Sequence, residues 1–325
     1  MKCLNLHGIG DLKFDEKETP SFGDDEVLLK VKYCGVCGSD IGRVYSHGTY
    51  HFPTVIGHEF SGEVVKDNSG EYLGKRVAVF PLLPCFKCDM CESENYAQCR
   101  NYDYYGSRRD GGFSEYIAVK KWNLIELPEN VSFAEGCMCE PCSVALHAIK
   151  KLGDINGKNI LITGAGPIGI IVGLWAKKFG ANRIYFIDID EQKIKFAQGF
   201  GFLKHNGEEV DCSIEGTGAA SALTSAINSV KAFGSIVLMG NPSRNVDLTA
   251  KDYQSILRKE LYLSGTWNSK YSDEWRQSLE YINKGELNIK KLITHEVSLD
   301  GCIEAFKMMR DRKEFYCKVV AKIDQ

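Results

Sequence analysis

The stretch NILITGAGPIG at residues 159–169 decides the fold of the second half of the chain. Its first five residues are an apolar run typical of a buried strand, and a helical apolar pattern follows as far as Gly180. A second apolar run, RIYFI at residues 183–187, ends at Asp188. A glycine-rich turn between a strand and a helix, with an acid after the next strand, is the pattern of a dinucleotide-binding βαβ unit. The sequence therefore predicts a doubly wound parallel sheet.

This turn also predicts the kind of cofactor. Its three glycines let the backbone approach a pyrophosphate, which would lie at the N-terminus of the helix. The acid at position 188 would accept hydrogen bonds from ribose hydroxyls, and a carboxylate repels a 2′-phosphate, so NAD is predicted rather than NADP. The lysine at 193 either supports the same ribose or is a solvated surface residue. The predicted cofactor-binding residues are Gly164, Gly166, Ile168, Gly169, Asp188 and Lys193.

Further elements of this region follow from the same patterns. Strands are predicted at residues 210–215, 235–239 and 261–265, and a helix at 274–283. A parallel crossover needs a dozen or more residues, and residues 204–210 do not provide them. One crossover helix is therefore predicted to be missing or collapsed.

The first 125 residues have a different pattern, in which short β-like runs alternate with glycine and proline turns. Examples are residues 27–33, 76–80 and 114–119. Many short strands with few helical periods predict a partly open β-barrel. The C-terminal run at 317–323 is predicted to return to this domain, which would make the domain discontinuous.

A second chemical centre is predicted between residues 34 and 59. Cys37 lies between a valine and a glycine, His58 follows 21 residues later, and Glu59 is next to it. A thiolate, an imidazole and a carboxylate are all zinc ligands, and fewer than four protein ligands leave a position open for chemistry. The simpler alternatives are a turn cysteine and a hydrogen-bonded histidine.

A tight cysteine cluster predicts another metal site. Cys85, Cys88, Cys91 and Cys99 have spacings that suit tetrahedral thiolate ligation and do not suit two disulfides. The segment 85–99 has no apolar core of its own, so zinc would supply its folding energy. We predict a closed structural zinc site.

Length, charge and cysteine count restrict the class of protein. The 325 residues allow about two domains. A net charge of -3 gives no reason to expect a nucleic acid or an anionic membrane as a partner. The N-terminus has no signal-peptide pattern and no apolar run is long enough to span a bilayer. Thirteen cysteines in such a chain favour metal binding over disulfides, and a cytoplasmic location is predicted.

Together these motifs resemble the zinc-containing medium-chain alcohol/polyol dehydrogenase family over nearly the whole chain. The matching stretches are GVCGSD at 35–40, GHE at 57–59, the cysteine segment 85–99, Glu140-Pro141 and the glycine turn 164–169. The resemblance implies a GroES-like catalytic domain, with the lobe 85–99, and a Rossmann NAD-binding domain. The implied domain ranges are 1–141 with 268–325, and 142–267.

The resemblance also implies the ligands of the catalytic zinc. Cys37, His58 and either Glu59 or Glu140 would hold the metal, because in this family the two carboxylates can exchange places. A buried acid in a salt bridge is the alternative for each glutamate. Asp40 would orient His58 through the second ring nitrogen, or would cap a helix.

The implied reaction is the oxidation of a secondary alcohol. Zinc would stabilise the alkoxide of a substrate hydroxyl, and hydride would pass to the nicotinamide of NAD. Ser39 would relay the proton, unless its hydroxyl only caps the local turn. Gly42 stands where some relatives carry a histidine that completes the relay.

Three stretches are most similar to the branch of the family that acts on galactitol 1-phosphate, and this resemblance implies oxidation to tagatose 6-phosphate. They are PLLPCF at 81–86, GSRRDGG at 106–112 and LRKEL at 257–261. A phosphate needs donors that can fork onto its oxygens, which favours arginine. Arg43 is predicted for this role, and Arg108 and Arg109 are either further candidates or solvated.

Other activities use similar residues. A sorbitol-like polyol dehydrogenase or an L-threonine dehydrogenase would need the same zinc and hydride chemistry. A protein of another class would bind NAD and zinc without turnover. The resemblance implies a homodimer or homotetramer with one catalytic and one structural zinc per subunit, a small polyol or polyol-phosphate substrate, and no nucleic-acid or membrane partner.

Overall fold

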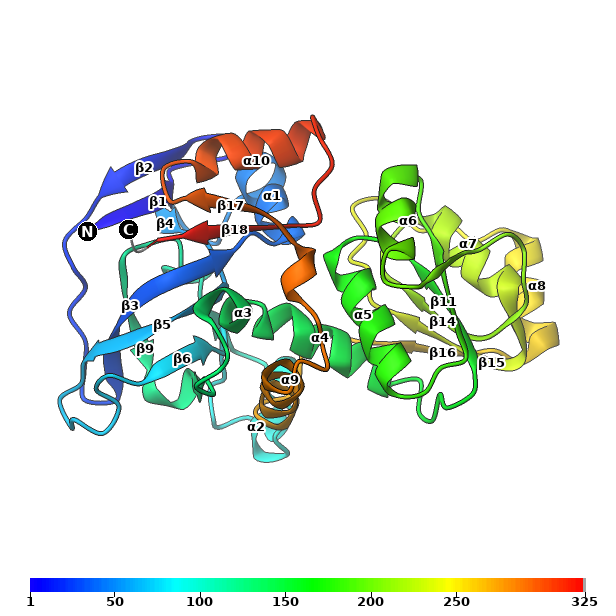
Figure 1. Ribbon diagram of the computed structural model, residues 1–325, viewed down its shortest axis with the longest axis horizontal. Helices are drawn as coiled ribbons and strands as arrows, with labels where there is room; N and C mark the ends of the chain where they lie inside the picture. Colours follow the sequence, from blue (N-terminus) through cyan, green and yellow to red (C-terminus); the bar gives the residue numbers. More distant parts are fainter. Residues whose placement is uncertain (324–325) are drawn as a thin grey trace. The chain divides into compact units, whose positions relative to one another are not determined.

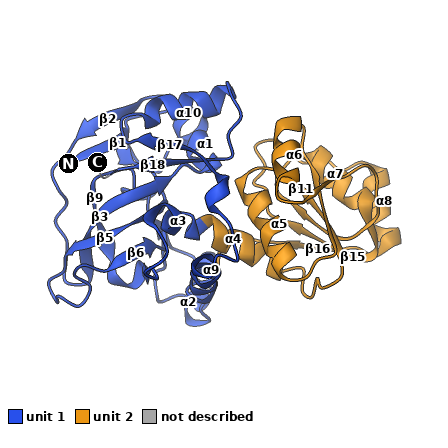
Figure 2. Ribbon diagram, viewed as in Figure 1, with its two compact units in different colours: residues 1–140, 270–325 blue, residues 141–269 orange. Residues whose placement is uncertain are grey.

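The protein is described by a computed structural model over residues 1–323. Two compact units are present (Figure 2). Unit 1 combines residues 1–140 with the chain from residue 270 onward, and unit 2 is residues 141–269. The sequence placed the corresponding boundaries at 141/142 and 267/268.

Unit 1 is built on β-sheets around one apolar core (Figure 1). Its seven-stranded sheet has the order β10-β6-β5-β3-β18-β17, with β9 also paired to β3. A three-stranded sheet β2-β1-β4 and the short pair β7-β8 complete it. The strands are β1 (Lys2–Leu6), β2 (Leu12–Glu16), β3 (Glu26–Gly35), β4 (Thr54–Val55), β5 (Glu59–Lys66), β6 (Arg76–Val79), β7 (Leu82–Leu83), β8 (Asp103–Tyr104), β9 (Tyr116–Lys120), β10 (Leu124–Glu126), β17 (Ile293–Ser298) and β18 (Lys318–Lys322).

Short helices connect these strands. The helix α4 (Cys139–Lys150) starts in unit 1 and continues into unit 2. The other helices of unit 1 are α1 (Gly38–Gly42), the π-helical turn η1 (Arg43–His47), α2 (Asp89–Glu92), η2 (Tyr96–Gln98), η3 (Lys121–Asn123), α3 (Phe133–Cys137), α9 (Asp273–Asn283), η4 (Lys290–Leu292) and α10 (Cys302–Asp311).

The C-terminal strand β18 lies inside the main sheet of unit 1. It pairs antiparallel with β3, with Val320 opposite Gly35, and parallel with β17. Its valines and alanine are fully buried. The first half of β18 therefore lies beside the end of β3 that leads into the Cys37 turn.

Unit 2 confirms the predicted doubly wound sheet. Six parallel strands have the order β13-β12-β11-β14-β15-β16. The predicted strands 159–163, 183–187 and 210–215 have these bounds in the structure. The elements are β11 (Asn159–Thr163), α5 (Pro167–Lys178), β12 (Arg183–Ile187), α6 (Glu191–Gln198), β13 (Leu203–Lys204), β14 (Val210–Glu215), α7 (Ala220–Ser229), β15 (Val230–Leu238), α8 (Ala250–Lys259) and β16 (Tyr262–Gly265).

The predicted gap in the crossovers is also confirmed. Residues 205–209 connect β13 to β14 without a helix. The connection passes β12 and β11, a distance of three strand spacings or about 14 Å, which five extended residues can cover. The loop is fixed by two hydrogen bonds, from His205 N to Phe186 O and between the His205 ring and Glu208 O.

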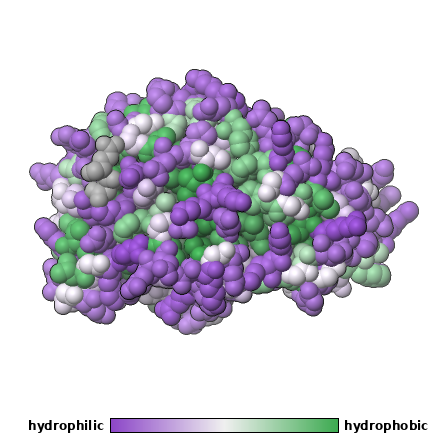
Figure 3. All heavy atoms as spheres, in the orientation of Figure 1, coloured by the Kyte–Doolittle hydropathy of each residue, from purple (hydrophilic) through white to green (hydrophobic). Residues whose placement is uncertain are grey.

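Polar side chains cover most of the face seen in Figure 3, and apolar residues show between them. Within residues 1–323, none of the helices has the length and apolar character that crossing a bilayer requires.

Candidate metal centre and cofactor site

Three of the predicted zinc ligands lie together at one end of the main sheet of unit 1. Cys37 is the N-cap residue of α1, directly after β3, and Glu59 is the first residue of β5. The register of these antiparallel strands places Gly35 opposite Glu59. One donor atom each of Cys37, His58 and Glu59 lies within 4.8 Å of the others.

The donor set fits zinc. It combines sulfur, nitrogen and oxygen ligands, which zinc accepts, and three ligands leave a fourth position for a substrate oxygen. His58 is 4% exposed and Glu59 1% exposed, so the site is shielded from bulk water apart from Cys37, which is half-buried. Lys318 already contacts the buried Glu59 carboxylate, so the salt bridge that the sequence offered as the alternative for Glu59 is formed. A divalent metal would add the positive charge that a Cys37 thiolate beside this pair needs.

Glu140 lies outside this close set. It is in the first turn of α4 and is 7% exposed. Burial raises the pKa of Glu140 to about 7, with the charges of His58 and Glu59 also acting on it. The structure thus places Glu59 rather than Glu140 against Cys37 and His58, with the second carboxylate nearby.

Asp40 joins His58 to the backbone of the Cys37 turn. Its Oδ1 lies 3.2 Å from His58 Nδ1, and its Oδ2 accepts a hydrogen bond of 3.0 Å from Cys37 N. Burial would raise the pKa of Asp40, but His58, Arg43 and this backbone N–H lower it to about 2. Asp40 therefore makes both contacts that the sequence presented as alternatives.

Arg43 is already bonded on the side facing this centre. Its Nη1 donates to Ser39 Oγ and to Asp40 Oδ1, both at 2.8 Å, and lies 3.5 Å from His58 Nδ1. The side chain is only 16% exposed. The guanidinium predicted to meet a substrate phosphate is thus engaged behind His58. The sequence contained the signal, because Ser39 and Asp40 precede it by four and three residues on one helical face.

A histidine does lie beside Gly42. A Cβ added at Gly42 would be 2.7 Å from Cε1 of His47, which is exposed at the end of η1. The imidazole of His47 thus fills the space that a side chain at position 42 would need.

Two residues of this centre were missed from the sequence. Lys318, on β18, is 2% exposed, contacts the Glu59 carboxylate through Nζ, and donates to Val36 O at 3.0 Å. Tyr104, on β8, has its ring centroid 5.9 Å from that of His58. Neither residue belongs to a motif, and both reach the centre only through strand pairing.

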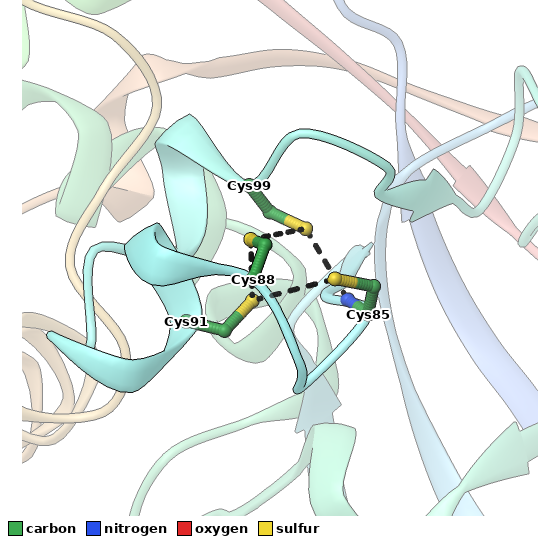
Figure 4. Close-up of side chains that lie close together, drawn as sticks. All are labelled: Cys85, Cys88, Cys91 and Cys99. Atoms are coloured by element: carbon green, nitrogen blue, oxygen red, sulfur yellow. Dashed lines mark hydrogen bonds between the residues drawn. The ribbon is translucent and has the colours of Figure 1, made fainter.

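The four clustered cysteines also converge (Figure 4). The sulfur of Cys88 is 3.5 Å from that of Cys91 and 3.9 Å from that of Cys99, and Cys85 Sγ is 3.9 Å from Cys91 Sγ. The backbone N–H of Arg100 is the largest cause that lowers the pKa of Cys88, to about 6, whereas burial raises that of Cys91 to about 12. Four convergent thiols without a disulfide fit a tetrahedral zinc.

Aromatic rings attach this lobe to the rest of unit 1. The ring of Trp122 lies 4.9 Å from Phe86 and 5.2 Å from Tyr96, both in the lobe. Trp122 also stacks on Tyr271, with the two ring centroids 3.9 Å apart.

In unit 2 the glycine turn has the geometry that a pyrophosphate site requires. Gly164 has a φ of 94°, and Gly166 is the N-cap residue of α5. A Cβ at Gly169 would lie 1.9 Å from Gly164 O, so only glycine allows this close packing of the helix on the turn. Ile168 is half-buried in the first turn of α5.

Asp188 directly follows β12 and fixes the turn. Its Oδ2 accepts a hydrogen bond of 2.8 Å from Ala165 N, and its Oδ1 accepts one of 2.9 Å from Asp190 N. Each oxygen keeps a lone pair for a further donor. Lys193 lies half-buried on α6.

Comparison with known proteins identifies the family of both parts of the chain. Residues 23–129 match the model of the alcohol dehydrogenase GroES-like domain, and residues 167–284 match that of the zinc-binding dehydrogenases.

Individual relatives cover most of the chain. Galactitol 1-phosphate 5-dehydrogenase of Escherichia coli K12 is 34% identical over 306 residues, 87% of this chain and 88% of the relative. L-idonate 5-dehydrogenase of Vitis vinifera is 32% identical over 320 residues, 89% of this chain and 86% of the relative. The crystal structure of galactitol-1-phosphate dehydrogenase from Escherichia coli superimposes with a TM-score of 0.93 at 32% identity, covering 99% of this chain and 100% of the other. The chain belongs to the zinc-containing medium-chain alcohol/polyol dehydrogenase family.

Proposed function

We propose that the protein oxidises a secondary hydroxyl of a sugar-alcohol phosphate with zinc and NAD, and that the substrate is galactitol 1-phosphate, giving tagatose 6-phosphate. The observation that carries the reaction class is the convergence of Cys37, His58 and Glu59 in a shielded site. The substrate is supported by the 34% identical relative that acts on this compound.

Zinc and NAD would supply the reactive groups, and residues of the protein would position them and move the proton. Zinc would act as a Lewis acid on the substrate hydroxyl, and NAD would accept the hydride. Asp40 keeps Nδ1 of His58 occupied, so Nε2 is the ring nitrogen that would hold the metal. Ser39 Oγ accepts a hydrogen bond from Arg43, and the Ser39 side chain is exposed. Its oxygen would take the substrate proton while its own hydroxyl hydrogen passes to solvent water.

Asp188 supports the choice of NAD. Its carboxylate follows the second strand of the βαβ unit, where a 2′-phosphate would meet negative charge. We therefore propose Gly164, Gly166, Ile168, Gly169 and Asp188 as the cofactor site.

The assembly and location are part of the same proposal. The edge strand β16 is exposed along its whole length, which supports a homodimer, or a tetramer built from dimers. All thirteen cysteines are thiols, which supports work in a reducing compartment such as the cytoplasm.

Steady-state assays test the function directly. The kcat/KM for NAD reduction should be highest with galactitol 1-phosphate and much lower with sorbitol or L-threonine. NADP should be a poor substitute for NAD. Cys37→Ser should abolish turnover without loss of NAD binding, since the thiolate lies in unit 1. A higher kcat/KM for L-threonine or sorbitol would replace the proposed substrate, and full NAD affinity without turnover on any of them would point to a binding protein.

A further inference from the structure

Arg108 differs from the other two arginines considered for a substrate phosphate. Arg43 is bonded to Asp40, and Nε of Arg109 donates to Asp103 at 2.7 Å. Each of these guanidinium groups is thus already neutralised by a carboxylate. In the part of the chain that the structure describes, Arg108 has no such counter-ion.

Aromatic side chains hold Arg108 in place instead. Its Cζ lies 4.1 Å from the ring centroid of Tyr50 and 4.5 Å from that of Tyr102. Its Nη2 donates to Tyr50 Oη at 3.1 Å. A guanidinium carries five N–H donors, and among residues 1–323 this one donates only to Tyr50. The group is therefore positioned, charged and able to donate further.

The same aromatic residues connect Arg108 to the metal centre. The ring of Tyr102 contacts that of Tyr104 at 6.4 Å, and Tyr104 contacts His58 at 5.9 Å. Backbone bonds fix this arrangement, because Arg108 N donates to Tyr104 O at 3.0 Å and Arg108 O lies 3.0 Å from Nε2 of His51. Arg108 thus stands at the end of a row of rings that starts at His58, all within unit 1.

This position suits the chemistry of the proposed substrate. In galactitol 1-phosphate the phosphate is separated from the oxidised carbon by a carbon chain, so the anion must be bound away from the metal ligands. Arg43 lies against Nδ1 of His58, directly behind the ligand set. Arg108 is set apart from it by two tyrosine rings.

The surrounding charges also favour an anion. Asp103 is paired with Arg109, and Asp110 is paired with Lys17 at 2.7 Å, so neither acid is left to repel a phosphate. An arginine fork can bind two phosphate oxygens at once, and a guanidinium already fixed by its neighbours loses little freedom on binding.

We propose that Arg108, held by Tyr50 and Tyr102, binds the phosphate group of the substrate and so selects the phosphorylated polyol. This assignment rests on the proposed function. It replaces Arg43 in that role and leaves Arg43 to position Ser39 and Asp40.

Arg108→Gln tests the assignment through the ratio of kcat/KM for galactitol 1-phosphate to that for galactitol. The ratio should fall roughly 10- to 100-fold, chiefly through KM, because a charge-assisted bond to the phosphate is lost. Zinc content should not change, and the kcat/KM for galactitol should fall far less than that for galactitol 1-phosphate. Inorganic phosphate should inhibit galactitol oxidation competitively in the wild type and about tenfold more weakly in the variant. Arg108→Lys should recover part of the ratio, since it restores a charge without the fork.

The double variant Arg109→Gln/Asp103→Asn is the matched control, because it removes the neighbouring guanidinium of the same loop without leaving the Asp103 carboxylate unpaired. It should leave the ratio within about threefold of the wild type. An unchanged ratio in Arg108→Gln, or an equal fall in the double variant, would overturn the assignment while the proposed function stands. A wild type that does not prefer the phosphorylated substrate would overturn the phosphate substrate and this subsite together.

Discussion

At the scale of single residues, Lys318 is the buried cation that balances Glu59. Its Nζ contacts the Glu59 carboxylate, and both side chains are almost fully buried. Lys318→Met would leave that carboxylate unpaired in the metal-free protein, at a cost of about 3–5 kcal/mol. Bound zinc would compensate much of this cost, since the carboxylate could then face the metal.

Urea unfolding with and without zinc measures this effect. We expect a large loss of stability for Lys318→Met without zinc and a much smaller one with zinc, whereas Lys318→Arg should stay near the wild type in both. Equal losses in the two conditions would show that Lys318 acts in packing alone.

Glu140 should make the stability of the metal-free protein depend on pH. Burial raises its pKa from the ordinary value of 4.5 to about 7. Between these values the folded state binds a proton that the unfolded chain has released. The unfolding free energy therefore falls as pH rises through this window, by at most about 1.4 kcal/mol per pH unit.

Urea midpoints between pH 5 and 8 check this sign. In Glu140→Gln the unfolding free energy should no longer fall across this pH range as it does in the wild type, because the amide does not titrate. If the urea midpoints of the two proteins changed with pH in the same way, Glu140 would not be the group responsible for the loss of stability.

The residues of the metal centre differ in how far sequence could predict them. Cys37, His58 and Glu59 lie in short glycine-containing runs, so their residue types and order are visible along the chain. Lys318 is 259 positions from Glu59 and meets it only because β18 pairs with β3. The sequence left Arg108 as either a phosphate candidate or a solvated arginine, because Tyr50, which also holds it, lies 58 positions away.

At the scale of elements, the cysteine lobe should lose its metal without unfolding the sheets. The largest cause of the low pKa of Cys88, about 6, is the N–H of Arg100, so its thiolate is ready to bind zinc at neutral pH. Cys88→Ser should lower the zinc content from two to one per subunit. Faster hydrogen exchange should be confined to the lobe, because the apolar core that holds the sheets of unit 1 includes no residue of the segment 85–99.

Metal analysis and exchange mass spectrometry test this together, with Cys212→Ala in unit 2 as the control that should keep both metals. A variant of Cys88 that retains two zinc ions would contradict the structural site.

Elements were easier to predict than their ends. The apolar runs at 159–163 and 183–187 have their predicted bounds because a parallel strand is buried on both faces and glycine turns delimit it. The run at 235–239 belongs to a longer strand, β15, which already starts at Val230. Its first part contains a register shift against β14 and exposed residues such as Phe233, so no apolar pattern marks it.

At the scale of the whole molecule, the sheet of unit 2 ends in an unprotected edge. Among residues 1–323, β16 pairs with β15 alone. Its four residues are exposed, with Tyr262 at 67% and Leu263 at 38%, and Trp267 beyond it is 53% exposed. Unpaired strand edges with apolar side chains readily pair with another chain. A second copy related by a two-fold axis would place β16 against its own equivalent, antiparallel, and cover these side chains.

Replacing both Tyr262 and Leu263 by lysine should therefore give monomers. Each added charge would meet a like charge near the axis, and lysine at an edge strand opposes pairing. Sedimentation velocity across micromolar concentrations should show a dimer or tetramer for the wild type, and a dissociation constant raised at least 100-fold for the variant.

Leu73→Lys, at an exposed turn of unit 1, should not change the assembly. A wild type that stays monomeric, or a double variant that still associates, would exclude β16 as the interface, because pairing through this edge cannot tolerate four lysines at its centre.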